Sequence, residues 1–357
     1  MKNKVLQEDM ADIFNRNIEW SKLNKKTILL TGAYGMIASY IVYYILYLNN
    51  EKNMNIHLIT VVRNRDKFYK KFNGVYGIDD IEVIQSDLAT PLQIEKSVDF
   101  IIHAASLASP QYYGICPVDV IQPNVIGNYY LLQLAKEKKV EGYLLFSTGD
   151  VYGAVNPELK YIDENSFGHM DTLDIHNCYS ESKRLAETMC KAFNVQYGVP
   201  TRIARIFHTY APTIDVNNDP RVFASFVKNI VDGEDIIMKS NGLGKRSFCY
   251  ITDAIAGYFA VLLYGKDAEA YNVCNTDQFI SIRDLSECLV SLYPNRKLKV
   301  IMKKREKSEN YVENVLLLGN ESIPDNKKLM ELNWAPKVSV REGFDRVVRY
   351  IEDGKHK

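Results

Sequence analysis

Short runs of β-forming residues alternate with helix-length segments from residue 26 onward, and this alternation limits the fold more than any other feature of the chain. Strands separated by segments of this length are joined by crossovers that place the strands parallel, with helices on both faces of the sheet. The sequence therefore predicts an α/β fold built on a doubly wound parallel sheet. The predicted strands are residues 27–31, 56–62, 81–85, 100–103, 143–147 and 201–206.

The same pattern divides the chain into unequal parts. Residues 1–24 carry apolar side chains at near-helical spacing, which predicts an N-terminal helical arm packed on the domain edge or on a second subunit. Residues 25–206 hold the strand and helix alternation of a predicted Rossmann-type, NAD(P)-binding domain. The pattern is looser in residues 207–357, where we expect a smaller C-terminal α/β domain for the substrate, with the chain returning to the first domain around 246–275.

Composition excludes several classes of partner. The 357 residues include 44 Lys plus Arg and 44 Asp plus Glu, so no bulk charge attracts nucleic acid or an anionic membrane. The longest apolar run, 37–48, is shorter than the roughly 20 residues that a membrane span needs. No signal-peptide pattern precedes residue 26, so we expect a cytoplasmic protein. The six cysteines have neither C-x-x-C spacing nor a pairing with histidine, so neither a disulfide framework nor a metal site is predicted.

A glycine-rich turn joins the first predicted strand to a long apolar helix. Gly32 and Gly35 allow the backbone to approach a pyrophosphate, and the free N–H groups at the start of the helix would bind that anion. Glycine also serves any tight turn between a strand and a helix, so a turn without a nucleotide is the alternative. The residues predicted to bind a dinucleotide here are Gly32, Tyr34, Gly35, Met36 and Ile37.

The end of the second predicted strand, residues 61–65, lacks the carboxylate that usually binds the adenosine ribose. Arg63 could stack on adenine or pair with a 2′-phosphate, whereas Asn64 could hold a ribose, so NAD is predicted with NADP as the alternative. A solvated basic loop would also explain these residues. After the third strand, Asp87 could accept a hydrogen bond from the adenine amino group or cap a helix, and Leu88 is grouped with it as a predicted cofactor residue.

Two segments supply side chains for proton transfer. Tyr179 and Lys183 are four residues apart in a predicted helix, so they share one helix face. A phenol titrates near pH 10, and a neighbouring ammonium favours the phenolate. Thr148 follows a buried strand at the carboxyl edge of the sheet and could share a proton with Tyr179 and a substrate hydroxyl. In a chain with 24 tyrosines this spacing arises by chance, so the prediction depends on the order of the motifs.

Taken in order, these motifs resemble those of the extended short-chain dehydrogenase/reductases that modify nucleotide sugars. The resemblance spans roughly residues 25–350 and is greatest to the UDP-glucuronate decarboxylase and dTDP-glucose 4,6-dehydratase branch. The segments that carry it are the turn at Gly32, residues 103–110, 147–153, 179–190, 204–210 and 221–223, and residues 246–253.

The resemblance implies an activity and a set of site residues. Such enzymes oxidise the sugar at C4 with bound NAD, act on the 4-keto intermediate and return the hydride. Tyr179 would be the base, Lys183 would tune it, Thr148 would orient the hydroxyl, and Asp150 would move a proton at the keto stage. Further implied cofactor residues are Ala104, Ala105 and Ser106. Implied substrate residues are Ser109, Pro110, Asn124, His208, Arg221 and Arg246, the two arginines clamping the diphosphate unless they form structural ion pairs.

Position 149 bears on the choice among related reactions. In the resembled family a dehydratase carries an aspartate there and a decarboxylase a serine, whereas this chain has Gly149 followed by Asp150 in place of a glutamate. The loss of the acid removes the proton donor for the departing C6 hydroxyl, so decarboxylation is favoured over 4,6-dehydration. A 4-epimerase or C4 dehydrogenase is the alternative, and a non-catalytic dinucleotide-binding module is the alternative from another class. The family analogy also implies a homodimer through residues 129–137 and the Tyr179 helix.

Overall fold

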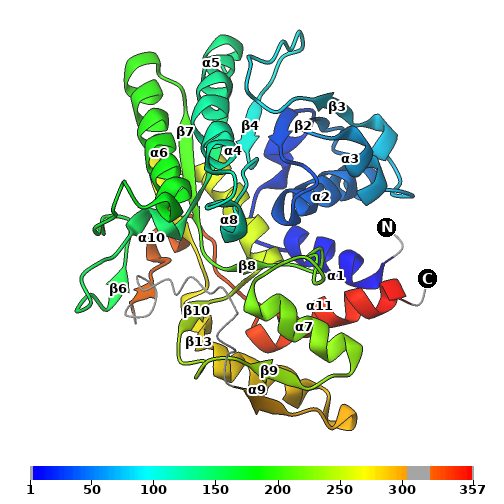
Figure 1. The fold of residues 1–357 in the computed structure, drawn as a ribbon. Helices are drawn as coiled ribbons and strands as arrows, with labels where there is room; N and C mark the ends of the chain where they lie inside the picture. The colour runs from blue at the N-terminus through cyan, green and yellow to red at the C-terminus, as the bar shows by residue number, and fades with distance from the viewer. Residues whose placement is uncertain (1–2, 304–321, 356–357) are drawn as a thin grey trace.

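The computed structural model describes residues 3–303 and 322–355, and its centre is a sheet of seven parallel strands (Figure 1). The strand order is β12-β7-β5-β4-β1-β2-β3, and each neighbouring pair is parallel. The predicted doubly wound α/β class is therefore confirmed. The strands are β1 (Thr27–Thr31), β2 (His57–Val62), β3 (Glu82–Gln85), β4 (Phe100–His103), β5 (Gly142–Thr148), β7 (Thr201–Ile206) and β12 (Glu269–Val273).

The strand order reverses between β1 and β4. The chain runs outward from β1 through β2 to β3, then crosses back to place β4 on the other side of β1. In sheets of this kind the crevice at the carboxyl ends of the strands, beside the reversal, is where ligands bind. The turn that follows β1 therefore lies where sheets of this kind bind their ligands.

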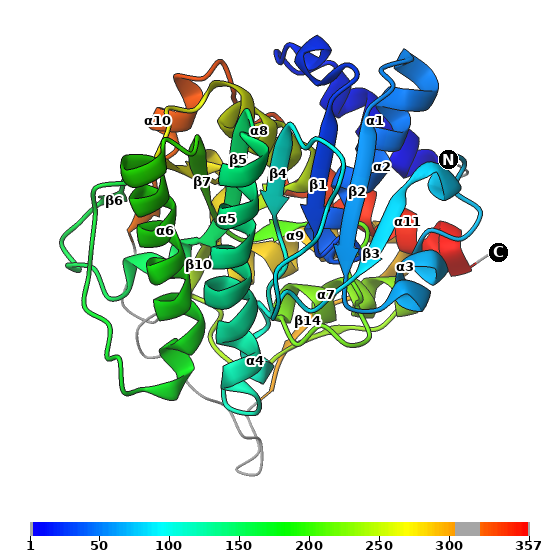
Figure 2. The ribbon, with the colours of Figure 1, turned by 90° about the horizontal axis from the view of Figure 1, so that it is seen from above.

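Helices cover both faces of the sheet (Figure 2). The helices α5 (Asn128–Lys138) and α6 (Cys178–Tyr197) lie on one face, and α2 (Met36–Lys52) and α8 (Ile251–Tyr264) lie on the other. Within β1, Ile28 and Leu30 join one core cluster and Leu29 joins the opposite one. Successive side chains of a strand point to opposite faces, so a strand buried on both sides reads as a continuous apolar run.

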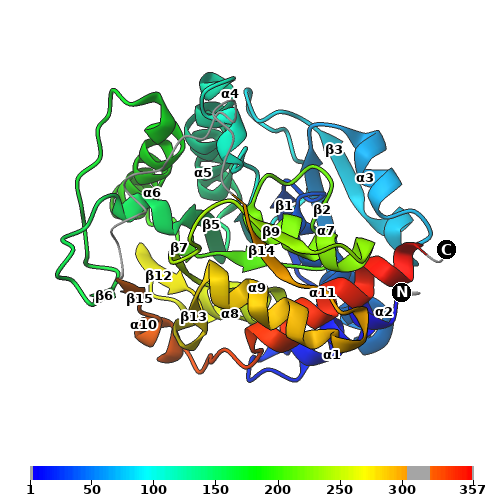
Figure 3. The same cartoon turned by 60° about the horizontal axis from the view of Figure 1, so that its bottom comes forward.

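Three helices and several short strands form the C-terminal part, in which α7, α9 and α11 pack on one another (Figure 3). This group lies where the sequence predicts a substrate domain, and that role stays a prediction. Its helices are α7 (Val222–Asp232), α9 (Ile282–Leu292) and α11 (Val340–Lys355). The remaining short elements are α3 (Arg65–Lys71), α4 (Pro117–Gln122), α10 (Lys327–Met330), β6 (Tyr161–Ile162), β8 (Thr209–Tyr210), β9 (Ile236–Met238), β10 (Lys245–Ser247), β11 (Cys249–Tyr250), β13 (Phe279–Ser281), β14 (Val300–Met302) and β15 (Ile323–Pro324).

The chain returns to the main sheet through α8 and β12. Helix α8 contacts β5 and β7, and β12 pairs with β7 along the sheet edge, in register Tyr271↔Ala204. The six predicted strands did not include β12. Its first residues, Glu269 and Ala270, have weak strand propensity, and its pairing is decided by the exposed edge of β7 rather than by local sequence.

The N-terminal helix α1 (Lys4–Phe14) is built into the core of its own chain, against α8 and α11. Asp9 in this helix is completely buried and accepts hydrogen bonds from the hydroxyls of Tyr40 at 2.9 Å and Tyr250 at 2.8 Å. Its carboxylate also pairs with the Arg346 guanidinium at 2.8 Å. A buried charge with three donors ties the first helix to the last one.

Asp9 should give the stability a pH dependence of known sign. Burial raises its pKa from 3.8 to about 6, against the opposing effects of the Tyr250 hydrogen bond and the Arg346 charge. The folded state therefore binds more protons between these two values, so the linked stabilisation is complete below pH 3.8 and is lost as pH rises through 6. Only wild type carries this titrating group. We therefore expect the unfolding free energy of Asp9→Asn, measured relative to wild type, to be about 1 kcal/mol higher at pH 7 than at pH 5. Urea titrations at both pH values measure this, and an unchanged difference would contradict it.

The described residues also bear on membrane spans, metal sites and disulfides. No helix in residues 3–303 and 322–355 is long and apolar enough to cross a membrane. The same residues contain no group of three or more His, Cys, Asp or Glu side chains arranged to hold a metal ion. All six cysteines are free thiols.

Candidate active site

Hydrogen bonds to the Thr31 hydroxyl join the ends of β1 and β4 at the strand reversal. The Thr31 hydroxyl accepts the backbone N–H groups of Ala104 at 3.1 Å and Ala105 at 3.0 Å and lies 2.9 Å from His103 Nδ1. The other ring nitrogen, Nε2, lies 3.0 Å from the Pro123 carbonyl. Burial lowers the pKa of His103 to about 3, so the ring is neutral, and it donates from Nε2 and accepts at Nδ1. The predicted cofactor residues 104 and 105 are thereby fixed beside the glycine turn.

The glycine turn fits a pyrophosphate. Gly32 has a φ of +72°, and a Cβ there would lie 2.9 Å from the Ala105 Cα, so only glycine leaves this space open. Gly35 caps α2, whose first N–H groups have no partner within the helix. In the described part of the chain, the buried hydroxyl oxygens of Ser106 and Ser109 have no hydrogen-bond partner. Buried polar atoms are normally paired, so these two hydroxyls suit a ligand that lies across the turn.

The C-terminal part reaches over this turn. The predicted residues Tyr34, Met36 and Ile37 are partly buried and pack against the larger core cluster. The Met36 carbonyl accepts a hydrogen bond from the Thr213 hydroxyl at 3.0 Å, and Arg221 Nη2 lies 3.7 Å from the Met36 sulfur. A ligand bound at the turn would therefore be close to the C-terminal part as well.

Lys183 is buried on α6 with its charge directed at the end of β5. Its ammonium donates to the Phe146 carbonyl at 2.7 Å. Burial lowers the pKa of Lys183 to about 7, and the Glu187 carboxylate acts in the opposite direction. Glu187 is itself held by both nitrogens of an Arg205 fork, at 3.0 and 2.7 Å, and by the Ser147 hydroxyl. Because Glu187 is fixed one turn beyond Lys183, it helps to keep the lysine protonated.

Tyr179 lies one turn before Lys183, with the ammonium 5.9 Å from the ring centre. Its ring stacks on Tyr113 at 5.3 Å and 12°, a contact that sequence reasoning missed because the two residues belong to different elements. The expected shift toward phenolate is not found in the structure. Burial, and next the Asp150 charge, raise the pKa of Tyr179 above its ordinary value, whereas a hydrogen bond with Thr148 lowers it. The phenol therefore needs a further positive charge in the site before it can act as a base near neutral pH.

The charge of Arg246 acts on both Asp150 and His208. Both residues have exposed side chains, although burial within the surrounding protein is the main cause of the shift in each pKa. Burial raises the pKa of Asp150, with the Thr148 hydrogen bond and the Arg246 charge opposing it. Burial and the charges of Arg246 and Arg221 lower the pKa of His208 to about 3. A carboxyl group with a raised pKa and a neutral imidazole thus lie within the range of the same cation.

The space beside Gly149 is filled by an aromatic ring. A Cβ on Gly149 would lie 2.5 to 2.8 Å from three carbons of the Phe207 ring. That ring is buried and stacks on Tyr152 at 6.1 Å. Position 149 therefore has no room for an acid or a hydroxyl, because Phe207 occupies the volume such a side chain needs. Sequence reasoning noted the glycine but could not identify what replaces its side chain.

Two predicted substrate residues, Asn124 and Arg221, bond to other residues of the protein. Asn124 is completely buried, and its amide nitrogen donates to the Val120 carbonyl at 3.0 Å and the Ser182 hydroxyl at 2.9 Å. The bond to Ser182 connects Asn124 to α6. A contact between Asn124 and a substrate stays a prediction. Arg221 forms a two-nitrogen pair with Asp219, so a diphosphate would have to share or displace that carboxylate. Pro110 is exposed and begins a short turn after Ser109.

The predicted adenosine residues line the ends of β2 and β3. Asn64 caps α3 by accepting the Lys67 N–H at 2.8 Å. Asp87 accepts the Ala89 N–H at 2.9 Å, so it closes a turn and does not cap a helix. Leu88 follows with a φ of +64°. Their contacts with a nucleotide stay predictions.

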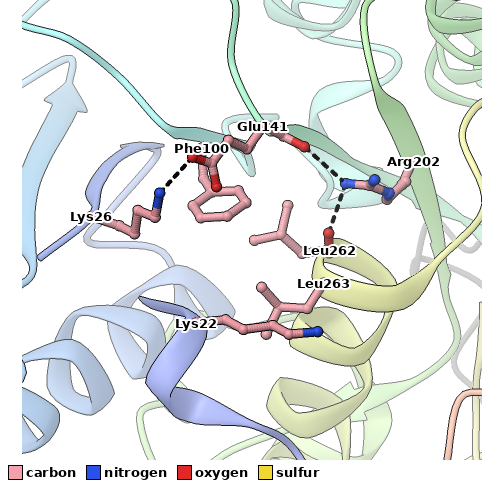
Figure 4. Close-up of a pocket in the computed structure, with 7 residues that line it drawn as sticks. All are labelled: Lys22, Lys26, Phe100, Glu141, Arg202, Leu262 and Leu263. Carbon is pink, nitrogen blue, oxygen red and sulfur yellow. Dashed lines mark hydrogen bonds and ion pairs between the residues drawn. The ribbon is translucent and has the colours of Figure 1, made fainter. Parts of the chain in front are cut away.

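A cavity of about 320 Å³ lies away from this chemistry, at the amino edge of the sheet (Figure 4). Lys26 pairs with Glu141 beside it, and Arg202 donates to the Leu262 carbonyl at 2.8 Å. These contacts hold the starts of strands together, and none of the proton-transfer residues borders the space. The residues that line it are Lys22, Lys26, Phe100, Glu141, Arg202, Leu262 and Leu263.

Comparison with known proteins identifies the family of the chain. A family model described as the NAD dependent epimerase/dehydratase family matches residues 28–274. Among curated proteins, UDP-glucuronic acid decarboxylase 3 of Arabidopsis thaliana is 34% identical over 330 residues, which is 92% of this chain and 90% of that protein.

Solved structures share the fold at lower identity. UDP-glucose 4-epimerase from Thermotoga maritima, solved with UDP-glucose, has a TM-score of 0.75 at 21% identity and covers 92% of this chain and 99% of its own. UDP-glucuronic acid 4-epimerase from Bacillus cereus, solved with UDP-glucuronic acid and NAD, has a TM-score of 0.72 at 20% identity, with coverage of 92% and 99%. The matched family model spans most of the chain and includes the glycine turn, Thr148, Tyr179 and Lys183. This chain therefore belongs to the NAD dependent epimerase/dehydratase family.

Proposed function

We propose that the protein oxidises a nucleotide sugar at C4 with bound NAD and decarboxylates the 4-keto intermediate, as a UDP-glucuronate decarboxylase does. The observation that carries this proposal is the grouping of Tyr179, Lys183 and Thr148 at the carboxyl end of β5, two strands from the strand that leads into the glycine turn. The curated relatives named UDP-glucuronic acid decarboxylases support the choice of reaction. The neighbours solved with NAD support the choice of cofactor.

The first step is removal of the C4 hydroxyl proton. Tyr179 Oη accepts this proton, and Thr148 Oγ1 aligns the hydroxyl through a hydrogen bond. The glycine turn at Gly32 and Gly35 would hold NAD, which would supply a hydride acceptor for C4 and a positive charge that favours the phenolate. The Lys183 ammonium, fixed on the Phe146 carbonyl, stabilises the same phenolate.

The second step occurs at C5. A 4-keto uronate is a β-keto acid, so the bond to its carboxylate can break with the electron pair passing to the C4 ketone. The resulting enolate must gain a proton at C5. Asp150, whose pKa is raised by burial, can carry that proton, and Tyr179 then returns the first proton to the C4 oxygen as the hydride comes back.

Position 149 separates this proposal from other reactions on the same scaffold. Expulsion of a C6 hydroxyl needs an acid near that oxygen, and the Phe207 ring fills the place where one would project. Asp150 is one methylene shorter than the usual glutamate, which favours a second candidate, a 4-epimerase or simple C4 dehydrogenase that needs no proton at C5. A binding module without catalysis would have no use for the buried Tyr179 and Lys183 pair.

Incubation with UDP-glucuronate tests the proposal. We expect UDP-xylose and carbon dioxide, detected by mass spectrometry, and we expect Asp150→Asn to lower their rate by about 10²-fold. Because that variant keeps Tyr179, it should still form reduced nicotinamide transiently. A 4-epimer as the product would support the second candidate, and no turnover of UDP-glucuronate would contradict the proposed substrate.

The proposed partner beside the substrate is a second copy of this chain. Figure 2 shows α5 and α6 side by side on one face of the sheet. Apolar side chains on this face are exposed, and a pair of such helices offers a self-complementary patch for a two-fold dimer. The exposed apolar residues of these two helices include Tyr129, Leu185, Val195 and Tyr197. The cytoplasmic location stays a prediction.

A further inference from the structure

We propose that the adenosine end of the cofactor site binds a 2′-phosphate through Arg63, so that the enzyme accepts NADP as well as NAD. The inference rests on the proposed function, because it concerns the same dinucleotide site. It depends on three observations: the place of Arg63 in the sheet, the partners of its neighbours, and the missing carboxylate.

Arg63 lies on the flank of the glycine turn away from the proton-transfer residues. The Gly32 N–H donates to the Val61 carbonyl at 2.9 Å, and Arg63 follows two residues later at the end of β2. On the other flank, β1 pairs with β4 and β4 with β5, which ends at Thr148. A dinucleotide with its pyrophosphate on the turn and its nicotinamide near Thr148 must extend its adenosine toward β2.

The Arg63 guanidinium is available. The residue is exposed, and in residues 3–303 and 322–355 no side chain or carbonyl pairs with it. The nearby polar groups are already used: Arg65 Nη2 donates to the Val83 carbonyl at 2.8 Å, and Asn64 Oδ1 accepts the Lys67 N–H at 2.8 Å. Arg63 thus differs from Arg65, whose role in holding α3 to β3 is structural.

The end of β2 itself carries no carboxylate, and the acids that follow it are Asp66 in the first turn of α3 and Asp87 after β3. Residues 61–65 contain no acid. Asp87 follows the neighbouring strand β3, and its Oδ1 accepts the Ala89 N–H at 2.9 Å. A carboxylate at the end of β2 selects the free 2′-hydroxyl and repels a phosphate there, whereas a guanidinium offers two parallel N–H donors to phosphate oxygens.

Arg63 could instead stack on the adenine ring, and the two modes differ in a measurable way. Stacking depends on the base alone, so it would strengthen ligands with and without a 2′-phosphate equally. An ion pair with the phosphate would strengthen only the ligand that carries it, and it would weaken as salt is added.

Calorimetric titration of the full chain with 5′-ADP and with adenosine 2′,5′-bisphosphate makes this distinction without relying on activity. We expect wild type to bind the 2′,5′-bisphosphate several-fold more tightly. Arg63→Ala should weaken its binding by about tenfold and leave 5′-ADP unchanged. Arg63→Lys should retain part of the preference, and Arg63→Asp should reverse it. Lys70→Ala, which removes an exposed cation from the last turn of α3, is the matched control and should change neither ligand.

Two results would overturn the inference while leaving the proposed function intact. One is equal affinity of wild type for the two ligands, and the other is an equal loss of both in Arg63→Ala, which would indicate stacking. If wild type bound neither ligand, the dinucleotide site itself would be wrong, and the proposed function would fall with the inference. Because Arg63 pairs with nothing in the described residues, its variants should unfold at the wild-type temperature, which thermal melts would verify.

Discussion

Replacing Tyr179 with phenylalanine is expected to lower kcat by about 10³-fold, because the variant loses the oxygen that hydrogen-bonds to the Thr148 hydroxyl. The ring itself should keep its place, since its stacking on Tyr113 and its burial do not depend on the hydroxyl. Affinity for NAD should therefore change little. The rate is measured as product formation from the nucleotide sugar, and the affinity by direct titration.

Thr148→Ser and Thr148→Ala provide the matched comparison for this result. Serine keeps the hydroxyl that bonds to Tyr179, whereas alanine removes it, so activity should follow the hydroxyl and not the methyl group. A Tyr179→Phe protein with activity within tenfold of wild type would remove Tyr179 from the proposed chemistry. A loss of thermal stability in that variant would show that the effect on kcat reports on folding.

The second large effect is expected at the glycine turn. Gly32→Ala should abolish dinucleotide binding, because the new methyl group would lie 2.9 Å from the Ala105 Cα, inside van der Waals contact. Ala105 is held by the Thr31 hydroxyl and cannot retreat without breaking that bond. We expect the affinity for NAD to fall by more than about 10²-fold, with a loss of about 1–3 kcal/mol of stability from the positive φ.

Gly74 supplies the control for backbone strain alone. It has the same φ of +72°, but nothing lies within 4 Å of a Cβ placed there. Gly74→Ala should therefore lose a similar amount of stability from φ while binding NAD as wild type does. If both variants bound NAD normally, the close approach at Gly32 would not serve a ligand. If both failed to bind, strain and not the steric contact would be responsible.

Much of the fold could be predicted because its signals are local. The apolar runs of β1, β2 and β4 are buried on both faces, so periodicity alone finds them. Gly32 was identified because its turn lies between a strand and a helix. The edge strand β12 was missed because its pairing depends on β7, more than 60 residues earlier in the chain.

The site was predictable in its residue types but not in its electrostatics. The spacing of Tyr179 and Lys183 places them on one helix face, and the structure agrees. The sequence could not indicate that burial raises the pKa of the tyrosine, since burial depends on packing from Tyr113 and from the walls of the crevice. Nor could it show that Phe207 fills the space at Gly149, because only the folded chain brings the two together.

The ion pair between the first and last helices has a consequence for synthesis in the cell. Asp9 leaves the ribosome early, yet Tyr250 follows 241 residues later and Arg346 follows 337 residues later. Until then the amphipathic α1 has no permanent place to dock, although the Rossmann half can already begin to collapse. Final closure of the molecule must therefore wait until α11 has been synthesised and can fold back onto α1, and a nascent fragment stalled before α11 would be a natural client for chaperones.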